Sequence, residues 1–300
     1  MIVVSVRGGL GNQMFQYAFG RSATAALERR LVLDLSRMPT GKVPHLRRFD
    51  LAQLPILAET KVIFGSASTR GASDESKVCV RHSYRTLGRA AKNVFRPWWV
   101  DEPLNEAVLD FSQIPKPFAI CHGYWQSPLY FEHIAHELRQ ELTPPLTQGS
   151  YAEHVLRQVR NQPTICVHVR RGDYVENERV HTVHGVLEPL YQQRAVESLA
   201  DTLGTKSVAL VFSDDPAWAQ QELQFGIEAI HVEVDQRLSS VESLALMSRC
   251  NHHVIANSSF SWWGAWLAQH EGQIVIYPAK WFASHSVDPT FRFPKSWKAQ

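Results

Sequence analysis

Arg170 and Arg171 are the residues whose type and position point most clearly to chemistry, because they directly follow an apolar segment. Two adjacent guanidinium groups bind phosphate oxygens bidentately and keep their charge, so the pair suits a diphosphate. Gly172 comes next and would let the backbone approach such a ligand closely. Surface salt bridges are the competing interpretation of two neighbouring arginines. The apolar residues before the pair favour the phosphate.

The element that must position this pair is the segment 164–169, where Ile165, Val167 and Val169 alternate with Cys166 and His168. This alternation predicts a strand, and a strand this apolar is usually covered on both faces in a parallel sheet. Open α/β sheets bind ligands at the carboxyl ends of their strands. The arginines are therefore expected at the binding edge of a sheet.

Two more predicted strands end in polar residues. Asp214 and Asp215 follow the strand predicted at 207–212, and an aspartate there could accept hydrogen bonds from guanine or only cap the next helix. Ser258 and Ser259 follow the strand predicted at 253–256, where hydroxyls and helix-start amides could hold a phosphate. The three strand ends together predict one nucleotide site.

The second half of the chain alternates strands with helices, which predicts a doubly wound parallel sheet. Helices are expected at 151–160, 188–203, from 216, at 241–247 and at 262–269, and the remaining strands at 230–232 and 273–277. The break at Thr143, Pro144 and Pro145 marks a boundary between domains at 1–148 and 149–300. The last helix could pack back onto the first domain.

The first half begins with a strand at 2–6, a glycine-rich turn and a helical pattern at 14–30, for which Asn12 is a natural N-cap. Such a turn offers backbone N–H groups to an anion or a sugar hydroxyl. It fails as a dinucleotide fingerprint, because Met14 stands where the third glycine should be. A strand at 31–34 follows, and 65–89 is predicted to form loops and short helices.

A further strand at 119–121 leads into an aromatic and amide-rich segment, 123–127. Aromatic rings such as Trp125 stack on sugars, or they fill a domain core, and both interpretations stay open. The segment 95–99, which combines Arg96 with Trp98 and Trp99, could touch a membrane surface or be core, and we favour core.

Composition indicates a soluble globular protein: of 300 residues, 44% are hydrophobic and 20% charged, and the net charge of +2 suggests no nucleic-acid partner. The first residues do not resemble a signal peptide or a membrane span, so a cytoplasmic protein is expected, with possible peripheral contact at the inner membrane. The scattered cysteines are expected to be core thiols: Cys79, Cys121, Cys166 and Cys250. No Asp-x-Asp occurs, and the histidine pairs lack companion ligands, so no metal is expected.

Five motifs, in this order, resemble those of the α-1,2-fucosyltransferases of glycosyltransferase family 11, and the bacterial members in particular. They are GGLGNQMFQY at 8–17, GYWQS at 123–127, HVRRGDY at 168–174, HG at 184–185 and SSFSWWG at 258–264. The resemblance implies a GT-B fold with two Rossmann-like domains facing a cleft and GDP-β-L-fucose as donor. It also implies inversion at the anomeric carbon, no cofactor or required metal, and the 2-hydroxyl of a β-galactoside-terminated glycan as acceptor.

The resemblance also assigns roles. Arg170 and Arg171 would stabilise charge on the departing β-phosphate, as fixed cations do in a transition state. The expected substrate-binding residues are His168 and Asp215 at the guanine, Ser258 and Ser259 at the phosphates, the turn residues Gly11, Asn12 and Gln13, and Trp125 and His184.

The acceptor hydroxyl needs a base, for which Asp173 and Glu178 are the candidates, with Glu176 and His184 as competitors. A strongly dissociative reaction would need little base. The alternatives to this function are a GDP-fucose enzyme acting on protein or chitin-type acceptors, a non-catalytic sugar-binding protein and, least favoured, a dinucleotide oxidoreductase.

Overall fold

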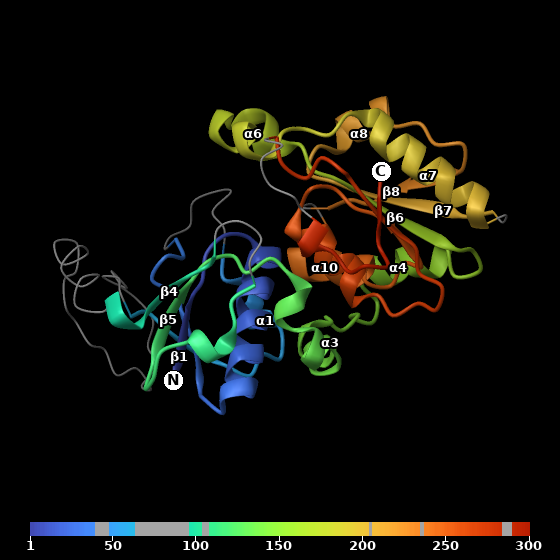
Figure 1. The fold of residues 1–300 in the computed structure, drawn as a ribbon. Coiled ribbons are helices and arrows are strands. Elements are labelled where there is room, and N and C mark those ends of the chain that lie inside the picture. The colour runs from blue at the N-terminus through green and yellow to red at the C-terminus, as the bar shows by residue number, and fades with distance from the viewer. Residues whose placement is uncertain (40–47, 64–95, 104–107, 204–205, 235–236, 284–289) are drawn as a thin grey trace. The chain divides into compact units, whose positions relative to one another are not determined.

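The computed structural model describes residues 1–300 except 40–47, 64–95, 104–107, 204–205, 235–236 and 284–289 (Figure 1). It describes the backbone but not the side chains of Asp173, Arg179 and Val180. The chain divides into two compact units, Met1–Leu138 and Arg139–Gln300. The division falls within helix α3 (Ala135–Leu142), which ends directly before Thr143 and the two prolines, as predicted.

Within the described residues, unit 1 is built on five parallel strands in the order β3-β2-β1-β5-β4. The strands are β1 (Ile2–Ser5), β2 (Leu31–Asp34), β3 (Glu59–Lys61), β4 (Trp99–Asp101) and β5 (Ala119–His122). β1 lies in the centre and pairs with β2 on one side and β5 on the other, so the strand order reverses between β1 and β5. Helix α1 (Leu10–Leu27) connects β1 to β2. It packs closely on these strands because Gly20 has no side chain; a Cβ there would collide with Leu31 and Val4.

The predicted start of α1 is wrong. The helix begins at Leu10 with Gly9 as N-cap, so Asn12 lies in its first turn. Gly8 has a φ of +83°, and a Cβ there would lie 2.6 Å from Nδ2 of Asn12. The backbone therefore turns sharply at a glycine and enters the helix three residues earlier than a side-chain cap at Asn12 would allow.

Short 3₁₀ helices complete the described part of unit 1. They are η1 (Asp50–Gln53), η2 (Arg96–Trp98), η3 (Phe111–Gln113), η4 (Pro128–Tyr130) and η5 (Glu132–Ile134). Trp98 stacks on Phe118 with ring centroids 4.9 Å apart, and Trp99 packs against the core formed by Val3, Val32 and Ile120. Trp98 and Trp99 thus pack on the sheet while staying partly exposed, whereas Arg96 and Pro97 are exposed, so this segment is not core; residue 95 lies outside the described residues. The segment predicted at 65–89 lies outside the described residues.

Unit 2 is built, in its described part, on six parallel strands in the order β11-β10-β9-β6-β7-β8. The strands are β6 (Thr164–Val169), β7 (Val208–Ser213), β8 (Glu228–His231), β9 (His252–Val254), β10 (Val275–Tyr277) and β11 (Lys298–Ala299). The helices are α4 (Tyr151–Gln158), α5 (Gly172–Glu176), α6 (Glu178–His184), α7 (Pro189–Leu203), α8 (Pro216–Glu222), α9 (Ser240–Met247) and α10 (Ser259–Leu267), followed by the 3₁₀ helix η6 (Thr290–Arg292).

Helices cover both faces of this sheet, which confirms the predicted doubly wound arrangement. Figure 1 shows α7 and α8 on one face and α4 and α10 on the other. Along β6, Ile165 and Val167 pack with residues of α7 and α8, whereas Cys166 packs with residues of α4 and α9. All six residues of β6 are buried, as expected of a central parallel strand.

Three of the four cysteines lie in the described residues, and all three are buried free thiols: Cys121, Cys166 and Cys250. Burial raises the pKa of Cys121 to about 12. They are core thiols, as predicted, and Cys79 lies outside the described residues. No helix in the described ranges combines the length and apolarity needed to cross a bilayer.

Candidate functional site

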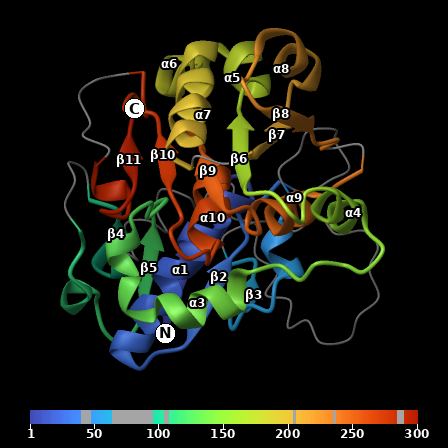
Figure 2. The ribbon, with the colours of Figure 1, turned by 90° about the vertical axis from the view of Figure 1, so that its right-hand side faces the viewer.

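The carboxyl ends of β6, β7 and β9 lie side by side, because β6 pairs with β7 on one side and β9 on the other. From β6 the chain moves outward through β7 and β8, and then returns to β9, so the strand order reverses between β6 and β9. Ligands of open α/β sheets bind where the order reverses. Figure 2 shows α5 directly beyond the end of β6 at this edge.

Asp214 holds both arginines in place. Its Oδ2 lies 2.8 Å from Nη1 of Arg170, and its Oδ1 accepts a 2.8 Å hydrogen bond from the backbone N–H of Arg171. A Cβ at Gly172 would lie 2.9 Å from Oδ2 of Asp214. Among the described residues, the Asp214 carboxylate therefore leaves no room for a side chain at position 172. Sequence reasoning gave Asp214 no role.

Arg171 lies against a second set of groups. Its guanidinium carbon is 3.9 Å from the ring centroid of Trp218, and its Nε lies 3.5 Å from Oδ2 of Asp215. Oδ1 of Asp215 caps α8 by accepting a 3.2 Å hydrogen bond from the N–H of Trp218. Of the two interpretations left open for this aspartate, the structure shows the cap, and contact with guanine stays a prediction.

His168 is a buried, neutral imidazole just before the arginines. It is 7% exposed and packs near Phe260, with ring centroids 6.1 Å apart. Burial lowers the pKa of His168 to about 4, with Asp214 opposing and Arg170 reinforcing this shift. Its Nδ1 is buried and has no hydrogen-bond partner among the residues that the structure describes. An unpaired ring nitrogen at this edge could accept a hydrogen bond from a ligand.

At the end of β9, Asn257 connects three segments. Its side-chain Nδ2 donates to the backbone carbonyl of His184 at 2.8 Å, and its backbone carbonyl accepts a 3.0 Å hydrogen bond from the hydroxyl of Tyr174. The rings of Tyr174 and His184 stack 5.0 Å apart. Asn257 is 2% exposed. Sequence reasoning gave it no role, although an amide directly after an apolar segment was a signal of a residue that connects segments by hydrogen bonds.

The serines that follow start a helix. Ser258 is the N-cap of α10, since its Oγ accepts a hydrogen bond from the N–H of Phe260, and Ser259 is the first residue of α10. The predicted helix at 262–269 thus begins three residues earlier.

Among the candidate bases, Glu178 is exposed at the start of α6, whereas the side chain of Asp173 is outside the described set.

In unit 1, the turn residues expected to contact the donor have structural roles. Gln13 is fully buried, and its amide donates to the carbonyls of Gly8 and Arg48 and accepts from the N–H of Leu51. Asn12 accepts a 2.8 Å hydrogen bond from Nε2 of Gln126. Gly11 is buried in the first turn of α1.

Trp125 does not fit the sugar-stacking role expected of it. Its side chain is 0% exposed and stacks on Phe19 with ring centroids 3.8 Å apart. It has a φ of +57°, so the backbone turns at this residue and buries the indole. Tyr124 is the exposed aromatic residue of the motif, at 38%.

The described residues contain no group of three or more His, Cys, Asp or Glu arranged to hold a metal ion.

The described residues form two α/β units in succession, each built on a parallel sheet, as the predicted fold with two Rossmann-like domains requires. The chain belongs to glycosyl transferase family 11, whose model matches residues 1–299. It is therefore a glycosyltransferase, as the motifs predicted.

Several curated relatives are similar over most of the chain. The O-antigen biosynthesis glycosyltransferase WbnK of Escherichia coli is 31% identical, covering 93% of this chain and 94% of that protein. The alpha-1,2-colitosyltransferase of Escherichia coli is 28% identical, covering 99% and 98%. Galactoside 2-alpha-L-fucosyltransferase SEC1 of Bos taurus is 28% identical, covering 89% and 64%. Among solved structures, a mutant of Arabidopsis thaliana FUT1 in complex with GDP aligns with 92% of this chain and 70% of that chain, at 15% identity and a TM-score of 0.48.

Proposed function

We propose that this enzyme transfers L-fucose from GDP-β-L-fucose to the 2-hydroxyl of a terminal β-galactoside, with inversion at the anomeric carbon. The observation that carries the proposal is the carboxylate-held pair Arg170 and Arg171 at the reversal point of the unit 2 sheet. A fixed cation at this position stabilises negative charge that grows as GDP leaves. The names of the fucosyltransferase relatives support the fucosyl group, the α-1,2 linkage and the galactoside acceptor.

The residues around the pair complete the proposed donor site. The unpaired Nδ1 of His168 and the carboxylate of Asp215 would contact the guanine, and Ser258 and Ser259 the phosphates. The arginines would take the electrostatic role that a divalent cation has in other transferases, so the reaction would need no metal.

The acceptor hydroxyl would attack the sugar face opposite GDP and lose its proton to a carboxylate. Asp173 and Glu178 remain the two candidate bases. α5 and α6, which carry them, are attached to the end of β9 through the hydrogen bonds of Asn257. This attachment supports placing the base on these helices.

A colitosyl donor is the second candidate, because a colitosyltransferase is similar over nearly the whole chain. Colitose differs from fucose by lacking the 3-hydroxyl. A site that hydrogen-bonds a hydroxyl discriminates strongly against the analogue without it, whereas an apolar site discriminates weakly.

The test is to incubate the purified enzyme with lactose and either GDP-fucose or GDP-colitose, and to identify the product linkage by NMR. A fucosyl-α-1,2-galactoside formed with the higher kcat/KM would support the proposal. A higher kcat/KM with GDP-colitose would favour the second candidate, and product with neither donor would refute both.

A further inference from the structure

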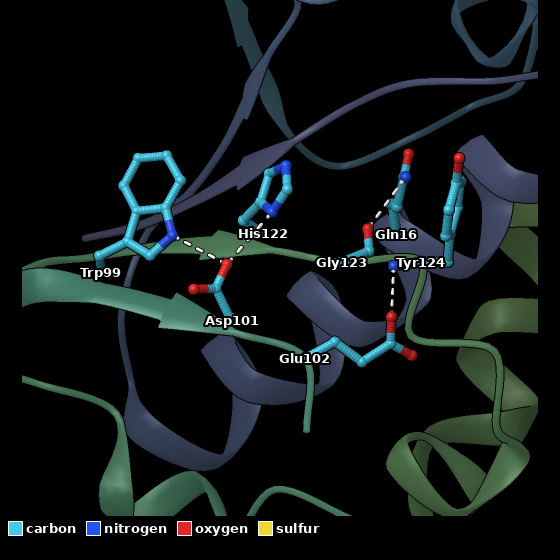
Figure 3. Close-up of polar contacts among 7 residues, drawn as sticks. All are labelled: Gln16, Trp99, Asp101, Glu102, His122, Gly123 and Tyr124. Carbon is cyan, nitrogen blue, oxygen red and sulfur yellow. Dashed lines mark hydrogen bonds and ion pairs between the residues drawn. The ribbon is translucent and has the colours of Figure 1, made fainter. Parts of the chain in front are cut away.

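The carboxyl edge of the unit 1 sheet contains a turn that is held in an unusual conformation. The carboxylate of Glu102 accepts a 2.7 Å hydrogen bond from the N–H of Tyr124 (Figure 3). It also accepts a 2.9 Å hydrogen bond from the N–H of Trp125. A Cβ at Gly123 would collide with the side chain of Glu102. Trp125 has a positive φ, which is rare for a bulky residue and marks a conformation that its surroundings impose.

A buried glutamine connects this turn to the neighbouring strand. Nε2 of Gln16 donates to the carbonyl of Gly123 at 3.1 Å, and its Oε1 accepts a 3.0 Å hydrogen bond from the N–H of Arg7. Arg7 follows β1, and Gly123 follows β5. The glutamine thus fixes the two strand ends between which the order of the sheet reverses, which is where open α/β sheets bind ligands.

The result of this arrangement is one exposed aromatic ring with a cation on it. Tyr124 is 38% exposed, and the guanidinium carbon of Arg7 lies 4.2 Å from its ring centroid. The guanidinium covers one face of the ring and orders it. A sugar could stack on the exposed part of the ring and donate or accept hydrogen bonds beside it.

His122 lies at the same edge and offers an acceptor. Its Nδ1 is 3.2 Å from Oδ1 of Asp101, which also accepts from Nε1 of Trp99 at 2.9 Å (Figure 3). Burial, with the charges of Arg37 and Arg7, lowers the pKa of His122 against the opposing effect of Asp101. With the proton on Nδ1, Nε2 is an acceptor; it is buried and has no partner in the described part of the chain.

We propose that Arg7, Tyr124 and His122 form the subsite that binds the acceptor sugar, a neutral hexopyranoside whose apolar face stacks on Tyr124. The subsite rests on the proposed function, because it takes the acceptor of that reaction. A neutral sugar is favoured over an anion, since two carboxylates, those of Asp101 and Glu102, lie at the same sheet edge as Arg7. The sequence named Trp125 among the substrate-binding residues; because its ring is buried, the proposal gives the stacking role to its exposed neighbour Tyr124.

The test compares Tyr124→Ala and Tyr124→Phe, with the KM for lactose measured at saturating donor and the Kd for GDP measured by calorimetry. Loss of the ring should raise the acceptor KM about tenfold or more and leave the GDP Kd within about twofold. Phenylalanine keeps the ring and should stay near the wild type. An unchanged acceptor KM for Tyr124→Ala would overturn the subsite, and a weakened GDP affinity with unchanged acceptor KM would assign this edge to the donor instead.

Arg237→Ala is the matched control for Arg7→Ala, because Arg237 stacks on Tyr151 of unit 2 at 4.1 Å. Only Arg7→Ala should raise the acceptor KM. If Tyr124→Ala fails to fold, lactose titrated into wild-type protein with labelled tyrosine should shift one tyrosine signal, which Tyr124→Phe removes. The absence of such a shift would overturn the subsite. Failure of the proposed function is distinct, since the wild type would then transfer nothing to lactose.

Discussion

The substitution Asp214→Asn tests the central contact of the unit 2 site. Asp214 and Arg170 form a 2.8 Å ion pair in which each side chain is only 19% exposed. Asparagine can still accept the hydrogen bond from the N–H of Arg171, but it carries no charge for Arg170. Removing one partner of a fully buried ion pair costs ~3–5 kcal/mol, whereas exposed pairs contribute ~0–1 kcal/mol. For this partly buried pair we expect unit 2 to lose about 2–3 kcal/mol.

Thermal unfolding followed by circular dichroism and calorimetry measures this loss. For a unit of this size, each 1 kcal/mol lowers Tm by ~2–4 °C, so the unit 2 transition should fall by about 5–10 °C. Because Arg170 is then no longer oriented, kcat should fall by about 10²-fold, the effect of a small misplacement of a catalytic group.

Asp215→Asn is the control, because it makes the same chemical change at the next residue. Asparagine caps helices as well as aspartate does, and the contact of Asp215 with Arg171 is 3.5 Å long with the aspartate 39% exposed. The loss should stay below about 1 kcal/mol. Equal melting of the two variants would refute the assignment of Asp214 as the residue that holds the arginines.

Three further predictions follow from the same structure. Arg170→Lys should lower kcat by about 10²- to 10³-fold while the protein stays folded, since an ammonium group cannot replace the guanidinium fork; near-normal turnover would contradict the phosphate role. Turnover should be unchanged in EDTA, and loss that added Mg²⁺ restores would contradict metal independence. Burial lowers the pKa of His253 to about 4, and its ring is within hydrogen-bond distance of the carbonyl of Met247 and the amide of Gln273. As the pH falls, the unfolded chain therefore protonates His253 near its ordinary pKa of 6.5, whereas the folded chain protonates it only near pH 4. His253 should contribute up to about 3 kcal/mol of the stability lost over that range, so denaturant titrations should show a smaller loss for His253→Gln than for the wild type; equal slopes for the two proteins would contradict this.

The unit 2 edge was predictable because short apolar segments alternating with helices identify the strands, and adjacent parallel strands bring their carboxyl ends together. The roles of Asp214 and Asp215 were not predictable. The two residues are chemically identical neighbours, and only the path of the backbone after β7 determines which of them meets Arg170 and which caps α8. Helix starts at Leu10 and Ser259 were also missed, because backbone geometry set them earlier than the expected positions.

Backbone geometry that the sequence does not reveal also determines what the polar residues of the unit 1 motifs contact. Asn12 and Gln126 bond to each other, and Gln16 bonds to Gly123, so these polar side chains connect α1 to the turn after β5. The exposed aromatic ring of this turn is that of Tyr124, between a glycine and a buried tryptophan. Trp125 has a positive φ and its side chain is 0% exposed, so the larger ring, which is the more obvious choice for binding a sugar, is the one buried.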